Sequence, residues 1–118
     1  MQKPDPLAGT WRVSSYETWN AQGQISTPFG DAPSGYAVFD TTGHAFIQMM
    51  GTAPDSAFAA YYGTYTIDDA GQTVTIHVEG SSMPSYTGTD QVRPFRVEGD
   101  TLTLGVPGQY RATLVRVR

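Results

Sequence analysis

Short runs of alternating apolar and polar residues, separated at near-regular intervals by turn residues, dominate this sequence. About eight such runs predict β-strands, and the connections DTTG, DDAG, EGD and VPG carry the Asp and Gly that tight turns need. Connections this short join neighbouring strands as antiparallel hairpins. The pattern therefore predicts an all-β, up-and-down antiparallel barrel of about eight strands. The predicted strands lie near residues 10–19, 36–40, 44–50, 61–67, 73–79, 92–98, 101–105 and 109–117.

Two segments do not fit this succession of hairpins. Residues 20–34 are predicted to form a long polar loop with room for one short edge strand. Residues 54–60 (PDSAFAA) predict a short helical turn, because Asp55 or Ser56 can cap it and an Ala/Phe run follows. The connection at 80–90 is long for a hairpin, and loops of this length in compact domains are often functional.

Length and composition restrict the class of protein. The 118 residues are expected to form one domain, 1–118 with its core at 7–117, and the absence of cysteine excludes a disulfide framework, a thiolate zinc site and a cysteine nucleophile. A net charge of −4 and thinly spread basic residues predict no nucleic-acid partner. No apolar run has the length of a signal peptide or a membrane span, so we expect a cytoplasmic protein without membrane insertion.

A histidine and a carboxylate share one face of a predicted strand. In TVTIHVEG (73–80), His77 and Glu79 stand two positions apart. Arg93 shares a face with Phe95, the expected inside, and a buried arginine needs a partner, so Arg93 is expected near Glu79 or a ligand anion. Two interpretations stay open. Either this face meets water, or it lines a cavity in which Arg93 binds a carboxylate or enolate oxygen and His77 moves a proton.

Aromatic and methionine side chains supply the remaining candidates for a binding site. Such residues at alternating strand positions are more often plain core, so packing is the alternative interpretation. No metal-ligating cluster and no glycine-rich phosphate loop is recognisable, so no metal and no cofactor is expected. The predicted ligand-binding residues are Tyr36, Met49, Tyr61, Tyr65, His77, Arg93 and Phe95, within a wider set that also includes Tyr16, Phe46 and Met50.

Several blocks of this sequence, in order, carry a resemblance to a known family. The chain opens with LAGTWRVSSYE, continues through PFGDAPSGYAVFDTTGHAFIQM and YYGTYTID, and has HVE at 77–79, proline at 84, GT at 88–89 and QVR at 91–93. Over residues 7–117 it resembles the lipocalin-like domain family of small single-domain proteins. The resemblance implies a closed β-barrel with an interior for a small apolar molecule, and it favours a His77 that faces inward or toward the mouth of the barrel. It implies no single activity.

The Gly9-Thr10-Trp11 start is shared with other eight-stranded cups. In such cups the tryptophan plugs the closed end and an arginine of the last strand lies over the indole. We therefore expect Trp11 and Arg116 to be structural, with Arg118 as the competing partner.

Three functions follow as hypotheses. The first is binding of a small apolar or aromatic ligand in the barrel, with Arg93 and His77 as polar anchors. The second is a cofactor-independent cyclase or isomerase that acts on a natural-product intermediate, with His77, Glu79 and Arg93 as catalytic residues. The third is a structural or dimerising barrel without ligand. Whether the protein is an enzyme, and whether it forms a homodimer, is left open.

Overall fold

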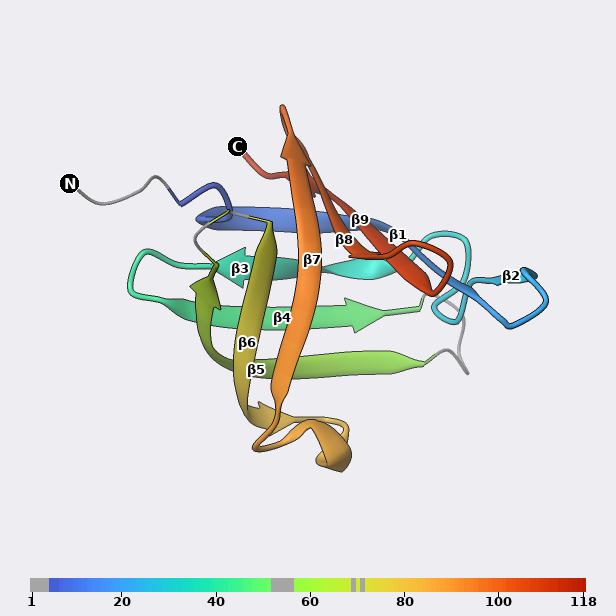
Figure 1. The fold of residues 1–118 in the computed structure, drawn as a ribbon, viewed down its shortest axis with the longest axis horizontal. Helices are drawn as coiled ribbons and strands as arrows, with labels where there is room; N and C mark the ends of the chain where they lie inside the picture. Colours follow the sequence, from blue (N-terminus) through green and yellow to red (C-terminus); the bar gives the residue numbers. More distant parts are fainter. Residues whose placement is uncertain (1–4, 52–56, 69, 71) are drawn as a thin grey trace.

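The computed structural model describes residues 5–51, 57–68, 70 and 72–118. Over these residues nine strands form one antiparallel sheet in the order β2-β1-β3-β4-β5-β6-β7-β8-β9, and β1 also pairs with β9 (Figure 1). The predicted all-β, up-and-down barrel is thus confirmed as eight closed strands, with β2 added beside β1. The strands are β1 (Gly9–Trp19), β2 (Ile25–Ser26), β3 (Ser34–Phe39), β4 (His44–Met50), β5 (Phe58–Ile67), β6 (Thr73–Ser81), β7 (Asp90–Glu98), β8 (Thr101–Val106) and β9 (Tyr110–Arg116).

Strand alternation and one irregularity in β1 decide which side chains face the interior. In β6 the apolar residues Val74, Ile76 and Val78 are buried, so the residues between them face outward. The register of β1 against β9 shifts between Val13 and Ser15. Strict alternation from Trp11 and Val13 would turn Ser15 inward. Because of this bulge, Tyr16 faces inward instead, opposite the buried Ala112.

Trp11 and Arg116 close one end of the barrel. Trp11 is fully buried, and its indole Nε1 donates a hydrogen bond of 2.9 Å to the carbonyl of Leu7, which is also fully buried. The Arg116 Cζ lies 4.2 Å from the centroid of the Trp11 rings, the contact that the sequence predicts. Such a cation–π contact contributes about 0.5–2 kcal/mol. Arg118 pairs with Asp100 instead.

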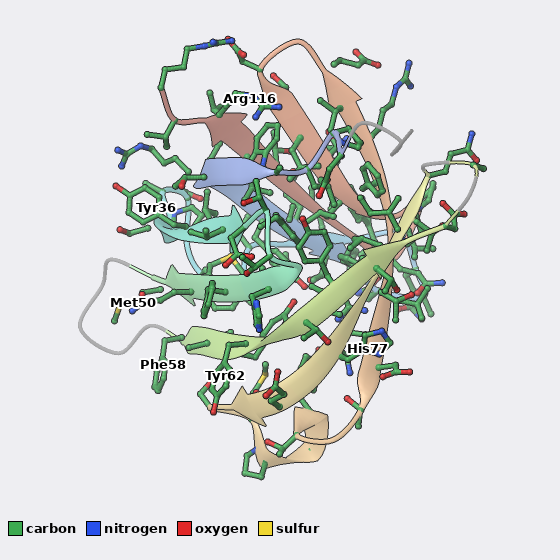
Figure 2. The ribbon with its side chains drawn as sticks, turned by 90° about the vertical axis from the view of Figure 1, so that its left-hand side faces the viewer. Tyr36, Met50, Phe58, Tyr62, His77 and Arg116 are labelled. Carbon is green, nitrogen blue, oxygen red and sulfur yellow. The ribbon has the colours of Figure 1, made fainter. Side chains whose placement is uncertain are left out.

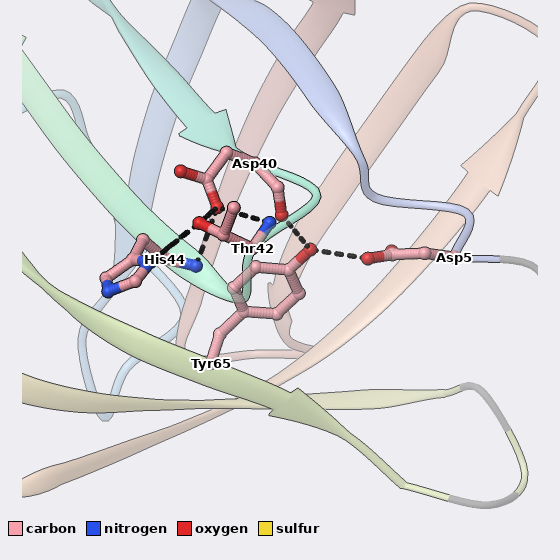
Figure 3. A network of polar contacts seen from close by, with 5 residues as sticks. All are labelled: Asp5, Asp40, Thr42, His44 and Tyr65. Carbon is pink, nitrogen blue, oxygen red and sulfur yellow. Dashed lines mark hydrogen bonds and ion pairs between the residues drawn. The ribbon is translucent and has the colours of Figure 1, made fainter.

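A polar network ties the N-terminal segment to this end (Figure 3). The Tyr65 hydroxyl donates to the Asp5 carboxylate and lies 3.1 Å from the Asp40 carbonyl oxygen. Burial, followed by the hydrogen bond with Asp5, raises the pKa of Tyr65. The ring of Tyr65 packs edge-on against Phe39 with 5.1 Å between centroids. Tyr65 therefore stabilises the closed end of the barrel, although the sequence predicts it as a ligand-binding residue.

The connections between the strands agree in part with those predicted from the sequence. Strand β2 occupies the predicted edge position within 20–34. The helical turn expected at 54–60 is wrong over 58–60, where β5 pairs with β4 through Met50 and Phe58; residues 52–56 lie outside the described part. A helical turn of the predicted seven residues is too short to form alone, so strand pairing prevails at 58–60. The long loop contains the 3₁₀ turn η1 (Pro84–Tyr86). Among the described residues, we find no helix with the length and apolar character of a membrane span.

Candidate functional site

The barrel encloses a cavity with about 130 Å³ of free space. Its lining includes Val13 and Tyr16 of β1 but not Trp11, so the cavity occupies the half of the barrel away from the closed end. Phe29, from the connection between β2 and β3, is also part of the lining and packs edge-on against Tyr16 at 5.3 Å between centroids. Small residues such as Ala59 and Ala112 on the inner face leave this space open.

One cation lies in this largely apolar lining. Arg93 points inward from β7, as its position beside Phe95 predicts, and is half-buried. Its guanidinium donates a hydrogen bond of 2.8 Å to Gln91 Oε1 and a longer one of 3.4 Å to the Tyr86 hydroxyl, and its Cζ lies 5.4 Å from the centroid of the Tyr110 ring. Among the described residues, no carboxylate forms an ion pair with Arg93.

Tyrosines surround this arginine. In the described part of the chain, the tyrosines of the lining are Tyr16, Tyr61, Tyr86 and Tyr110. Tyr61 meets Tyr86 edge-on at 5.7 Å, and Tyr16 stacks on Tyr110 at 6.3 Å. The Tyr110 hydroxyl is buried; Arg93 acts on its oxygen as a hydrogen-bond donor that opposes the rise in its pKa caused by burial, and no acceptor for the hydroxyl proton is found among the described residues. A buried donor without an acceptor is costly, so this donor is available to a ligand.

The protonation states make the site a donor of hydrogen bonds. Burial raises the pKa of Tyr61 to about 12, an effect that the Arg93 cation partly offsets. Burial likewise raises the pKa of Tyr16 and of Tyr110. Burial acts to lower the pKa of Arg93, but the coulombic effect of the surrounding tyrosines, which a phenol exerts only after losing its proton, outweighs it and raises that pKa. At neutral pH the cavity therefore presents a permanent cation beside neutral phenol groups.

His77 and Glu79 do not belong to this site. His77 lies on the outer face of β6 (Figure 2), its side chain is 42% exposed, and its Nδ1 is 2.8 Å from Asp90 Oδ1. Glu79 is exposed as well. The expected inward His77 and the expected pairing of Arg93 with Glu79 are therefore wrong, because Ile76 and Val78 occupy the inner face. Within the described residues, no group of three His, Asp or Glu side chains could hold a metal ion.

The other predicted ligand-binding residues divide between interior and exterior. Met49 and Tyr61 line the cavity. Phe95 is buried in the hydrophobic core and lies outside the lining. Tyr36 is 41% exposed on the outer face, and so are Phe46 and Met50 of the wider set, at 47% and 46%. These three predictions are wrong because their neighbours along the strand take the inner positions.

Two tyrosines of the site, Tyr110 and Tyr86, were not predicted as cavity residues. Tyr110 precedes Ala112 and Leu114 at a spacing of two on β9, an alternation that puts all three on the inner face and is readable in the sequence. Tyr86 comes from η1, within a loop, and no strand pattern indicates its direction.

Comparisons with known proteins agree with the fold. A crystal structure of an uncharacterized protein from Bacteroides eggerthii DSM 20697 is similar, with a TM-score of 0.57 and 14% sequence identity over 94% of this chain and 99% of that chain. This likeness concerns the fold alone. No match was found among curated proteins. The family model of the lipocalin-like domain matches residues 8–58 and 55–113. The chain thus belongs to the lipocalin-like domain family.

Proposed function

We propose that the barrel binds a small, mainly apolar molecule that carries one acidic group, and that Arg93 anchors this group. The observation that supports the proposal is a half-buried guanidinium in an apolar cavity without a carboxylate partner among the described residues. A desolvated cation without a counter-ion is costly, and a ligand anion removes that cost. Binding sites of this kind combine apolar walls with a few placed polar groups.

The dimensions favour a ligand with about one ring. The free space of about 130 Å³ is close to that of a dry engineered cavity of about 150 Å³ that accepts benzene. Tyr61, Tyr86 and Tyr110 add hydroxyls and ring faces that suit an aromatic acid.

Residues 1–118 form one domain in this proposal, as the sequence predicts. The cytoplasmic location likewise stays a prediction from the sequence.

The experiment is a calorimetric titration with a matched pair of ligands, phenylacetate and phenylacetamide. A hydrogen bond to a charged group contributes about 1.5–3 kcal/mol, so we expect the carboxylate to bind roughly 10- to 150-fold more tightly than the amide. Arg93→Met should abolish this preference. Arg96→Met is the control, since Arg96 lies on the same strand but is exposed and pairs with Glu98. Equal affinities for acid and amide in the wild type would refute the proposal.

A cofactor-independent isomerase or cyclase acting on a natural-product intermediate is the second candidate. It is favoured by the position of the Tyr61 hydroxyl, a hydrogen-bond donor, in the same cavity as the Arg93 cation. Such an arrangement stabilises an oxyanion or enolate that develops during a reaction. The test follows exchange of the α-protons of a small aryl ketone in heavy water by NMR. Acceleration that Arg93→Met reduces by about 100-fold supports this candidate, whereas exchange at the buffer rate eliminates it for this substrate class.

A further inference from the structure

The connection between β6 and β7 is joined to Arg93 by a chain of side-chain hydrogen bonds. The Thr89 hydroxyl donates to the Tyr86 carbonyl at 2.6 Å, and the Gln91 Nε2 donates to the Thr89 hydroxyl oxygen at 2.7 Å. The Gln91 Oε1 in turn accepts from the Arg93 Nη2 at 2.8 Å. The chain therefore runs from the 3₁₀ turn η1 to the cation of the cavity, and Gln91 is its central link.

Backbone hydrogen bonds fix the same segment to β6. The Gly88 N–H donates to the Val78 carbonyl, and the Val78 N–H donates to the Thr89 carbonyl, both at 2.9 Å. Gly88 has a φ of +81°, a backbone conformation that favours glycine. The segment from Gly88 to Arg93 is thus one hydrogen-bonded unit that is anchored on a strand of the barrel.

Both neighbours of Gln91 impose the same orientation on its amide. The Thr89 hydroxyl gives its one proton to the Tyr86 carbonyl, so its oxygen is left to accept and Gln91 must present Nε2 to it. A guanidinium has donors and no acceptor, so Gln91 must present Oε1 to Arg93 on the other side. The amide is therefore held in one orientation, and it holds the Arg93 Nη2 without adding a charge.

Gln91 acts on the cavity through Arg93. Its side chain is half-buried on the inner face of β7, which it shares with Arg93, and lies outside the cavity lining. On the same guanidinium, Nη1 makes a longer hydrogen bond of 3.3 Å to the Val92 carbonyl, which a ligand carboxylate can displace. A carboxylate at position 91 would have nearly the same size as the amide but would neutralise the cation. The neutral amide is thus what leaves Arg93 oriented and still uncompensated.

We propose that Gln91 is the positioning residue that makes the cavity select an acid over a neutral ligand of the same shape. This inference rests on the proposed function, since it concerns the same Arg93 anchor. Gln91 fixes one nitrogen of the guanidinium and adds no negative charge, so the ligand carboxylate is the group that compensates the cation. A donor that is already ordered binds more tightly than one that must first be ordered. Gln91 therefore determines both the affinity and the charge selectivity of the site.

The test measures the affinities for phenylacetate and phenylacetamide by calorimetry in variants at position 91. In Gln91→Glu the new carboxylate pairs with Arg93, so we expect the preference for the acid to fall below about threefold, with the affinity for the amide within about twofold of the wild type. Gln91→Met keeps the size but removes both hydrogen bonds, and should weaken binding of the acid about tenfold and of the amide less than about twofold. Gln48→Glu is the matched control, because it adds the same charge on the exposed outer face of β4 and should leave both affinities unchanged.

Circular dichroism melting curves establish that each variant is folded, and Gln91→Met decides if Gln91→Glu does not fold. A wild type that prefers the acid, together with a Gln91→Glu variant that keeps this preference, overturns the role of Gln91 and leaves the proposed function in place. Equal losses of acid and amide affinity in Gln91→Met indicate a structural role alone and overturn it as well. Equal affinities for acid and amide in the wild type refute the proposed function, and the role of Gln91 falls with it.

Discussion

Replacing Arg93 with methionine should make the ligand-free protein more stable. Methionine has a similar length and fits an apolar lining, so the change mainly removes the charge. The lost hydrogen bond to Gln91 (2.8 Å) costs about 1.5–3 kcal/mol, whereas those to the Val92 carbonyl (3.3 Å) and the Tyr86 hydroxyl (3.4 Å) are longer and contribute little. The lost contact with the Tyr110 ring costs about 0.5–1 kcal/mol. Against this, withdrawing a cation from water into the cavity costs several kcal/mol when no carboxylate compensates it.

The expected net effect is a gain of about 1–2 kcal/mol in the free energy of unfolding. For a chain of this size that corresponds to a Tm about 4–8 °C higher. Urea denaturation and scanning calorimetry of protein freed of ligand measure both quantities. Saturation with phenylacetate should reverse the order, because only the wild type gains from the bound anion.

Arg96→Met serves as the control for this measurement too, and should change the free energy of unfolding by less than about 0.5 kcal/mol, since Arg96 is exposed. A loss of more than about 2 kcal/mol in Arg93→Met would refute the reasoning. Arg93 would then be a structural residue that the barrel needs, and its position in the cavity would carry no information about a ligand.

Three further predictions concern other residues. Tyr65→Phe should lower the free energy of unfolding in urea by about 1–2 kcal/mol, because it removes the hydroxyl that donates to Asp5; an unchanged midpoint contradicts this role. Tyr61, with its pKa raised to about 12, binds its proton more tightly in the folded than in the unfolded state, so stability should fall between pH 10 and 12 by up to about 1.4 kcal/mol per unit, and Tyr61→Phe should flatten that slope. His77→Ala should leave phenylacetate affinity within about twofold, whereas a tenfold loss would return His77 to the site.

Turn residues and alternation were sufficient to predict the barrel from the sequence. Each predicted strand corresponds to a strand of the structure, because hairpins joined by short Asp/Gly turns leave neighbouring strands no other partner. The contact of Arg116 with Trp11 was also predictable, since the two residues lie on the last and first strands, which pair when the barrel closes.

The inner face of each strand was harder to predict than the strand itself. In β3, β4 and β5 the small residues Ala37, Ala45 and Ala59 are buried, while the larger Tyr36 and Phe46 are exposed. Side-chain size therefore does not identify the inner face here, because large residues lie on both sides: Phe39 and Tyr65 of the same strands are buried. Only the alternation of Val and Ile in β6 identifies its inner face, and it places His77 outside.

The sequence did not show which side chains of different strands and loops meet at the cavity. Tyr16 faces the cavity because a bulge in β1 changes the alternation, and Tyr86 reaches it from a loop. Neither a bulge nor a loop direction has a clear sequence signature. The partner expected for Arg93 was a carboxylate, whereas the structure surrounds it with tyrosines and Gln91.

The most direct test of the proposed site observes the Arg93 guanidinium itself. In ¹⁵N-labelled protein, the Nε–H signal of Arg93 is assigned by its absence from the spectrum of Arg93→Met, and that of Arg96 in the same way. On titration with phenylacetate, the Arg93 signal should shift and saturate at the concentration found by calorimetry, the Arg96 signal should stay in place, and phenylacetamide should shift neither by a comparable amount. An Arg93 signal that does not move when phenylacetate is bound, or one that moves no more than that of Arg96, would contradict the account.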